Sequence, residues 1–168
     1  MMLNKTGIFK KTKAIIEREF KLTISKNGGA INIALLFALM IILWAFSLSK
    51  VIEINLYLFP LTCICSIFAT QISLYYLFES DFADGFLEQL FLQQDIFDIA
   101  IAIKIFTHWI FFGFPLVILS VIFYLLLSEE ISFMETIYFG AGIFINTLAM
   151  TFISAVGQSL LVGEFGSA

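Results

Sequence analysis

The sequence predicts an all-α integral membrane protein, and three observations lead to this fold class. Of the 168 residues, 61% are hydrophobic and only 13% are charged, which is far too apolar for a soluble domain of this size. Four long runs contain no Asp, Glu, Lys or Arg, and each has the roughly 20 residues that a helix needs to cross a bilayer. None of these runs alternates between apolar and polar residues, which argues against a membrane β-barrel.

We expect the four transmembrane helices at residues 30–48, 55–78, 105–127 and 136–156. The third should be kinked near Pro115, which follows Gly113. A further helix is expected ahead of the spans, at residues 8–26, where apolar residues recur at helical spacing and basic residues fill much of the remainder. Such a basic amphipathic helix suits the cytoplasmic headgroup layer, where each Lys or Arg contributes roughly 1 kcal/mol of attraction to anionic lipid.

The basic residues also predict the orientation of the chain. Seven of the nine precede the first span: Lys5, Lys10, Lys11, Lys13, Arg18, Lys21 and Lys26. If the N-terminus is cytoplasmic, Lys104 also lies inside and only Lys50 lies outside, as the positive-inside rule requires. We therefore expect a multi-pass protein with a cytoplasmic N-terminus. The same asymmetry indicates topology in the lipid bilayer and not a nucleic-acid partner.

The loop at residues 81–104 is the one long polar interval between spans, and it should carry a short cytoplasmic helix. Leu87, Leu90 and Phe91 share one helical face, while Asp81, Asp84 and Glu88 line another. Asp84 is a suitable N-cap and Gly85 a tolerated first-turn residue, so the helix should begin near Phe86. A helix this short is unstable alone in water, and it must therefore lean on lipid or on a partner protein.

Polar residues in the second and fourth spans allow two interpretations. The residues concerned are Gln71 in the second span and Asn146, Thr151 and Gln158 in the fourth, beside several Ser and Thr. Close helix packing is the simpler interpretation, because small and hydroxyl side chains hydrogen-bond across membrane helices. The alternative is a polar wall along a substrate path.

Lys104, His108 and Trp109 lie together at the cytoplasmic start of the predicted third span. The simpler interpretation is that Lys104 reaches the headgroups while Trp109 and His108 share the membrane interface. A haem contact at His108 is the sharper alternative. No metal site is expected, because Cys63 and Cys65 fit neither a zinc pair nor a disulfide framework and read as small packing residues.

The motifs of common enzyme classes are missing from the sequence. It has no phosphate-binding loop for ATP, no His-Glu-x-x-His and no Gly-x-Ser-x-Gly. No span contains a pair of carboxylates. We therefore expect a non-catalytic membrane subunit whose work is driven by a partner.

Several motifs together resemble one family. They are Arg18-Glu19-Phe20, Asp84-Gly85-x-Leu87-Glu88-Gln89-Leu90, Lys104-x-x-x-His108-Trp109 and Gly113-x-Pro115-Leu116. In this combination the chain resembles haem exporter protein B, the permease subunit of the ABC complex of cytochrome c maturation system I. The Gly-x-Leu-Glu-Gln-Leu part is shared by many type-2 ABC exporters, and the Lys-x-x-x-His-Trp part narrows the resemblance.

The resemblance implies one ABC transporter transmembrane domain, residues 1–168, in the bacterial inner membrane. It implies a homodimer bound to a cytoplasmic ABC ATPase, with a haem-handling membrane subunit and a haem chaperone beside it. ATP would be hydrolysed on the ATPase, haem would be a substrate, and this chain would hold no cofactor. The loop helix would be a coupling helix that docks on the ATPase through Asp84, Gly85, Phe86, Leu87, Glu88, Leu90 and Phe91.

The chain departs from the family pattern in two places. Gln93-Gln94-Asp95 stands where the family usually has a Ser-Pro break. Members of the family also have six spans, so we expect this chain to be truncated after the fourth. The alternative function, from a different class, is a small structural or assembly membrane protein without an ATPase, whose loop helix lies on lipid.

Overall fold

The computed structural model describes residues 5–25, 28–48, 54–74, 77, 85, 92, 94–128 and 131–165. Its helices are α1 (Lys5–Ser25), α2 (Gly28–Leu48), α3 (Ile54–Leu74), α6 (Gln94–His108), α7 (Phe114–Leu127) and α8 (Phe133–Phe165). A π-helical turn, η1 (Trp109–Gly113), joins α6 to α7. No strand occurs in these ranges, which confirms the all-α prediction.

Among the described residues, four stretches are long and apolar enough to cross a membrane. They run over Gly29–Ser47, Leu56–Leu74, Phe97–Leu127 and Phe133–Ser159. Many large apolar side chains on them face outward, among them Phe46 and Tyr138, which are 76% and 72% exposed. Outward-facing apolar side chains over a whole bundle are what a lipid solvent requires, because the protein surface must match the hydrocarbon.

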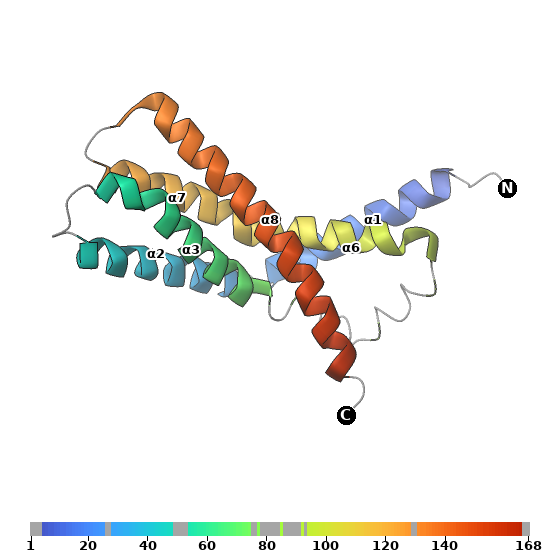
Figure 1. Cartoon of the computed structure of the whole chain (residues 1–168). Helices are drawn as coiled ribbons and strands as arrows, with labels where there is room; N and C mark the ends of the chain where they lie inside the picture. Colours follow the sequence, from blue (N-terminus) through green and yellow to red (C-terminus); the bar gives the residue numbers. More distant parts are fainter. Residues whose placement is uncertain are drawn as a thin grey trace.

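The third span begins earlier than the sequence predicted. It was expected at residue 105, whereas α6 begins at Gln94 and continues through η1 into α7. Asp95 and Asp98 led us to place this segment in the loop, and yet α6 packs along α1. In Figure 1, α1 and α6 lie side by side and extend together beyond the bundle of α2, α3 and α7.

The bundle is held by three apolar clusters that follow its length. The first joins Phe37 of α2, Cys65 of α3 and Leu116 of α7. The second, in which Ile143 is fully buried, joins α3, α7 and α8, and the third joins Leu74, Ile105 and Ala155. Each cluster includes α3, which therefore lies at the centre of the bundle.

Helix α8 crosses the other spans obliquely (Figure 1) and packs on both α3 and α7. Glycines allow this close approach. A Cβ atom at Gly142 would lie 2.6 Å from the ring of Phe59, and one at Gly140 would lie 3.3 Å from Val121. Small residues at helix contacts are the usual means of bringing membrane helices together.

The expected kink near Pro115 takes the form of a π-helical turn. The backbone N–H of Phe114 donates to the carbonyl of Trp109, five residues back. The next residue, Pro115, has no N–H to donate and stands in the first turn of α7. A wider turn directly before a proline thus keeps the helix continuous while it changes its hydrogen-bond register.

Candidate functional site

Most of the residues expected to dock on an ATPase lie outside the described part of the chain. These are Asp84, Phe86, Leu87, Glu88, Leu90 and Phe91. Gly85 is described, and it lies in a turn with φ of 68°. This left-handed backbone suits glycine and does not belong to a right-handed helix, so Gly85 is a turn residue and not the first-turn helical residue that we expected.

Two of the three large polar residues expected in the bundle, Gln71 and Asn146, form hydrogen bonds between α3 and α8. The amide nitrogen of Gln71 donates to Ser154 Oγ at 2.5 Å. The amide nitrogen of Asn146 donates to Ser66 Oγ at 2.7 Å. Both bonds join the same pair of helices: α3 supplies the amide in the first bond and α8 supplies it in the second. They support the packing interpretation, because these amides are engaged in holding the spans together.

The remaining polar residues of the stripe serve their own helix. Thr151 is buried and its hydroxyl donates to the carbonyl of Thr147 at 2.8 Å. The hydroxyls of Thr62 and Thr70 likewise donate to carbonyls of α3. Gln158 is half-buried near the end of α8. Hydroxyls that bond to the preceding turn stay satisfied in an apolar environment without a partner helix.

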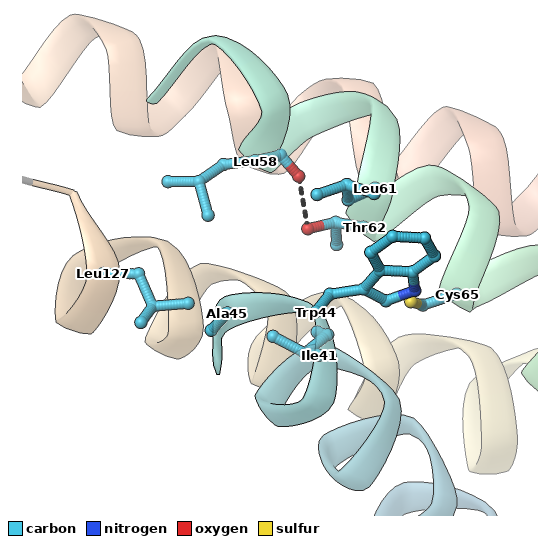
Figure 2. Close-up of a pocket in the computed structure, with 8 residues that line it drawn as sticks. All are labelled: Ile41, Trp44, Ala45, Leu58, Leu61, Thr62, Cys65 and Leu127. Atoms are coloured by element: carbon cyan, nitrogen blue, oxygen red, sulfur yellow. Dashed lines mark hydrogen bonds between the residues drawn. The ribbon is translucent and has the colours of Figure 1, made fainter. Parts of the chain in front are cut away.

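A small cavity lies between α2, α3 and α7, and Figure 2 shows its lining. Leu58, Thr62, Cys65 and Leu127 surround it, and the indole of Trp44 lies across it. Its volume is about 20 Å³, enough for about one water molecule. The hydroxyl of Thr62 is turned to the carbonyl of Leu58, at 2.6 Å. A space so small and apolar is a packing defect and not a substrate site.

His108 is buried at the junction of α6 and η1. Its Nε2 lies 3.1 Å from Ser73 Oγ of α3, within hydrogen-bond distance. Its ring stacks on Phe112 with centroids 4.3 Å apart. With one ring nitrogen near Ser73, the ring stacked on Phe112 and the side chain buried, His108 is placed to join helices.

Trp109 is buried beside it and anchors η1 to α8. The indole N–H donates to Thr147 Oγ1 at 3.3 Å, and the ring meets Phe144 edge to face at 4.9 Å. Gly113 makes this placement possible, because a Cβ atom there would lie 2.4 Å from Trp109 Cδ1. The side chain of Trp109 thus lies inside the bundle, with 4% of its surface exposed.

Lys104 was expected to reach the headgroups, but its side chain is buried between helices. It is only 7% exposed, and its Nζ lies 3.6 Å from Glu19 Oε2 of α1. Glu19 is 5% exposed, and its Oε1 also accepts a hydrogen bond from Arg18 at 2.7 Å. The sequence marked Glu19 only as part of a motif and gave it no role. The sequence did show Glu19 as an acid among the basic residues of the first helix, but its partner Lys104 is far away in the chain.

The described residues offer no cluster for a metal ion: nowhere among them do three His, Cys, Asp or Glu side chains come together. Cys65 is buried within the first apolar cluster, and Cys63 packs against the second. Both cysteines therefore act as packing residues, as the sequence predicted.

Comparisons with known protein sequences lead to one family. The family described as CcmB protein matches residues 10–164. Heme exporter protein B of Haemophilus influenzae is 30% identical over 150 residues, which cover 89% of this chain and 67% of that relative. Heme exporter protein B of Pseudomonas aeruginosa is 28% identical and that of Bradyrhizobium diazoefficiens 26%, each over 150 residues, covering 89% of this chain and 66% and 67% of the relatives. The chain thus spans about two thirds of their length, and no solved structure matches it.

Proposed function

This chain belongs to the CcmB protein family, and on that premise we propose that it is the membrane-spanning subunit of a haem exporter that acts in c-type cytochrome biogenesis. One observation carries the proposal. The family match extends over residues 10–164 and so includes all four candidate spans. Relatives named Heme exporter protein B match nearly the same stretch. The proposed substrate is haem, because the names of these relatives indicate it.

In this proposal the energy comes from a separate subunit. The sequence contains no phosphate-binding loop, so ATP is hydrolysed on a cytoplasmic ABC ATPase that docks on the loop between α3 and α6. Asp84, Leu87, Glu88 and Leu90 are the proposed centre of the contact. The apolar residues supply the buried anchor, and the acids steer the loop toward a basic rim on the ATPase.

The proposed location is the bacterial inner membrane with the N-terminus in the cytoplasm. Two observations support this orientation. Basic residues are concentrated ahead of the first span. Helix α1 also packs against α6, which follows the docking loop. The N-terminal helix and the start of α6, which follows the docking loop in the sequence, therefore lie at one end of the molecule (Figure 1), the end that faces the ATPase in this proposal.

The complete assembly is proposed to contain two copies of this chain, two ATPase subunits, a haem-handling membrane subunit and a haem chaperone. ATP hydrolysis either moves haem or releases the loaded chaperone from the haem-handling subunit, and we favour release. Gln71 and Asn146 are engaged in bonds between α3 and α8, which supports a conformational role for these residues.

The experiment is co-purification from mild detergent with the ATPase encoded beside this chain. We expect the ATPase to be recovered with the wild-type chain and lost with Leu87→Asp and with Glu88→Lys. Glu135→Lys is the matched control, because it reverses an exposed acid in the first turn of α8, at the opposite end of the spans. Recovery of the ATPase with both loop variants, at the level of the control, contradicts the docking assignment.

A further inference from the structure

An ion pair away from the docking loop joins the N-terminal helix to the third span. Glu19 of α1 and Lys104 of α6 are 3.6 Å apart, and their side chains are 6% and 8% exposed. The remaining carboxylate oxygen of Glu19 is bound by Arg18. An exposed ion pair on α1, between Lys13 and Glu17, is 3.9 Å long, and its side chains are 70% and 59% exposed. The two pairs therefore differ chiefly in burial and in which helices they connect.

Burial gives the Glu19–Lys104 pair a property that apolar contacts lack. Charges removed from water are tolerated only where their partners are correctly placed, so a buried pair penalises every other alignment of the two helices. An apolar contact of α1, such as the edge-to-face packing of Phe20 on Phe111 of η1 at 5.1 Å, carries no such penalty of an unpaired charge when the helices shift. The ion pair therefore fixes the rotation and the axial register of α1 on α6.

The position of Lys104 in the chain connects two other parts of the molecule. Helix α6 begins at Gln94, directly after the docking loop. Its last residue, His108, contacts Ser73 of α3, and the adjoining Trp109 contacts Thr147 of α8. Ile101 and Ile105, on either side of Lys104, pack against the cluster that contains Leu74 of α3 and Ala155 of α8, so the part of α6 that carries Lys104 is also the part that meets α3 and α8.

We propose that Glu19 and Lys104 are positioning residues that bind α1 and α6 into one rigid unit, which transmits movement of the ATPase-docking loop to α3 and α8. The transmission step rests on the proposed function, whereas the rigid unit does not. The pair takes no part in binding the ATPase, because it lies within the helix contact and not on the loop.

The test uses the full chain in lipid nanodiscs with Cys63→Ala and Cys65→Ala and with pairs of spin labels at exposed positions. One pair, at Leu22 and Ala102, reports the distance between α1 and α6. A second pair, at Ala102 and Ile153, reports the distance between α6 and α8. The main variant is Lys104→Met, which removes the connection while Arg18 still binds Glu19. Glu19→Asp keeps the charge but shortens its reach, and serves where Lys104→Met does not fold.

Without the ATPase, we expect a narrow distribution of the α1–α6 distance for wild type, Lys104→Arg and the control Lys13→Met. It should broaden for Lys104→Met and for Glu19→Asp. With the ATPase bound, nucleotide should shift the α6–α8 distance in the first three proteins and not in the last two, although all five retain the ATPase. Lys104→Arg is the rescue that a purely space-filling role for Lys104 would not predict.

Two outcomes overturn different statements. Distributions as narrow for Lys104→Met and Glu19→Asp as for wild type overturn the rigid unit. A nucleotide-dependent shift that survives in both variants overturns transmission through the pair. Failure of the wild-type chain to retain the ATPase overturns the proposed function instead, and the measurement without ATPase still decides whether the pair holds α1 on α6.

Discussion

The carboxylate of Glu19 lies 3.6 Å from the ammonium group of Lys104, and both side chains are almost fully buried between α1 and α6. A basic residue at the start of a membrane span ordinarily extends toward the headgroups. Here an acid from another helix takes the place of water, and so the N-terminal helix is tied to the third span.

Removing this acid should destabilise the protein. Glu19→Gln leaves the buried Lys104 without that carboxylate, and loss of one partner of a buried pair costs about 3–5 kcal/mol. Lys104→Met should cost less, because Glu19 keeps its bond to Arg18. Thermal unfolding in detergent measures both. The control is Glu17→Gln on the exposed side of α1, and equal melting temperatures for Glu19→Gln and Glu17→Gln would show that the buried pair contributes nothing.

The amide of Asn146 and the hydroxyl of Ser66 should stabilise the contact between α3 and α8. Bonds of this kind between membrane helices contribute about 0.6–2 kcal/mol. A double-mutant cycle with Asn146→Leu and Ser66→Ala, read by unfolding in detergent, isolates the pair. Ser159→Ala is the control, because that hydroxyl bonds only to the carbonyl of Val156 among the contacts described. A coupling energy of zero in the cycle contradicts the assignment.

Gly113 should not tolerate alanine. A Cβ atom there would lie 2.4 Å from Trp109 Cδ1, and overpacking of this kind costs about 1–3 kcal/mol. Gly157→Ala is the matched control in a helix, since a Cβ atom there meets nothing within 4 Å, and it should be neutral or stabilising by up to about 1 kcal/mol. Equal stability of the two alanine variants would mean that Trp109 does not require the glycine. Trp109→Leu combined with Gly113→Ala should recover part of the loss.

His108 should not ligate haem. Its Nε2 is within hydrogen-bond distance of Ser73 Oγ, and its ring is stacked on Phe112. His108→Asn, which keeps a polar group for Ser73, should give the same absorbance spectrum as wild type when haem is added to the purified protein. Its cost in stability should be about the 0.5–1.5 kcal/mol of one hydrogen bond. A shifted or lost haem band in this variant, at wild-type protein yield, refutes the positioning role.

The sequence predicted the spans well because their signal is local. Runs without charge predicted helices at residues 30–48 and 136–156, and the structure has α2 at Gly28–Leu48 and α8 at Phe133–Phe165, which differ from them at their ends. The start of α6 at Gln94 was missed because Asp95 and Asp98 read as loop residues, whereas α1 provides a partner for this part of the helix. This packing partner is a helix far away in the sequence, so no local pattern of residues could predict it.

The site was predicted less completely, for the same reason. Gln71 and Asn146 were predicted to serve either helix packing or a polar wall, but only the structure shows that each bonds a serine on the other helix. The change of register in η1 is a matter of backbone hydrogen bonds, and the sequence indicated only a kink near Pro115. Roles that depend on residue type alone were predicted, and roles that depend on long-range pairs were not.

One measurement tests the central claim most directly: photo-crosslinking from Leu87 in cells that express this chain with its ATPase. A photoreactive amino acid at Leu87 should give a crosslink to the ATPase, because the loop is proposed to insert its apolar residues into that subunit. The same amino acid at Ile131, an exposed position between α7 and α8 at the other end of the spans, should give none. Crosslinks from Leu87 to lipid alone would contradict the account and favour a membrane protein without an ATPase.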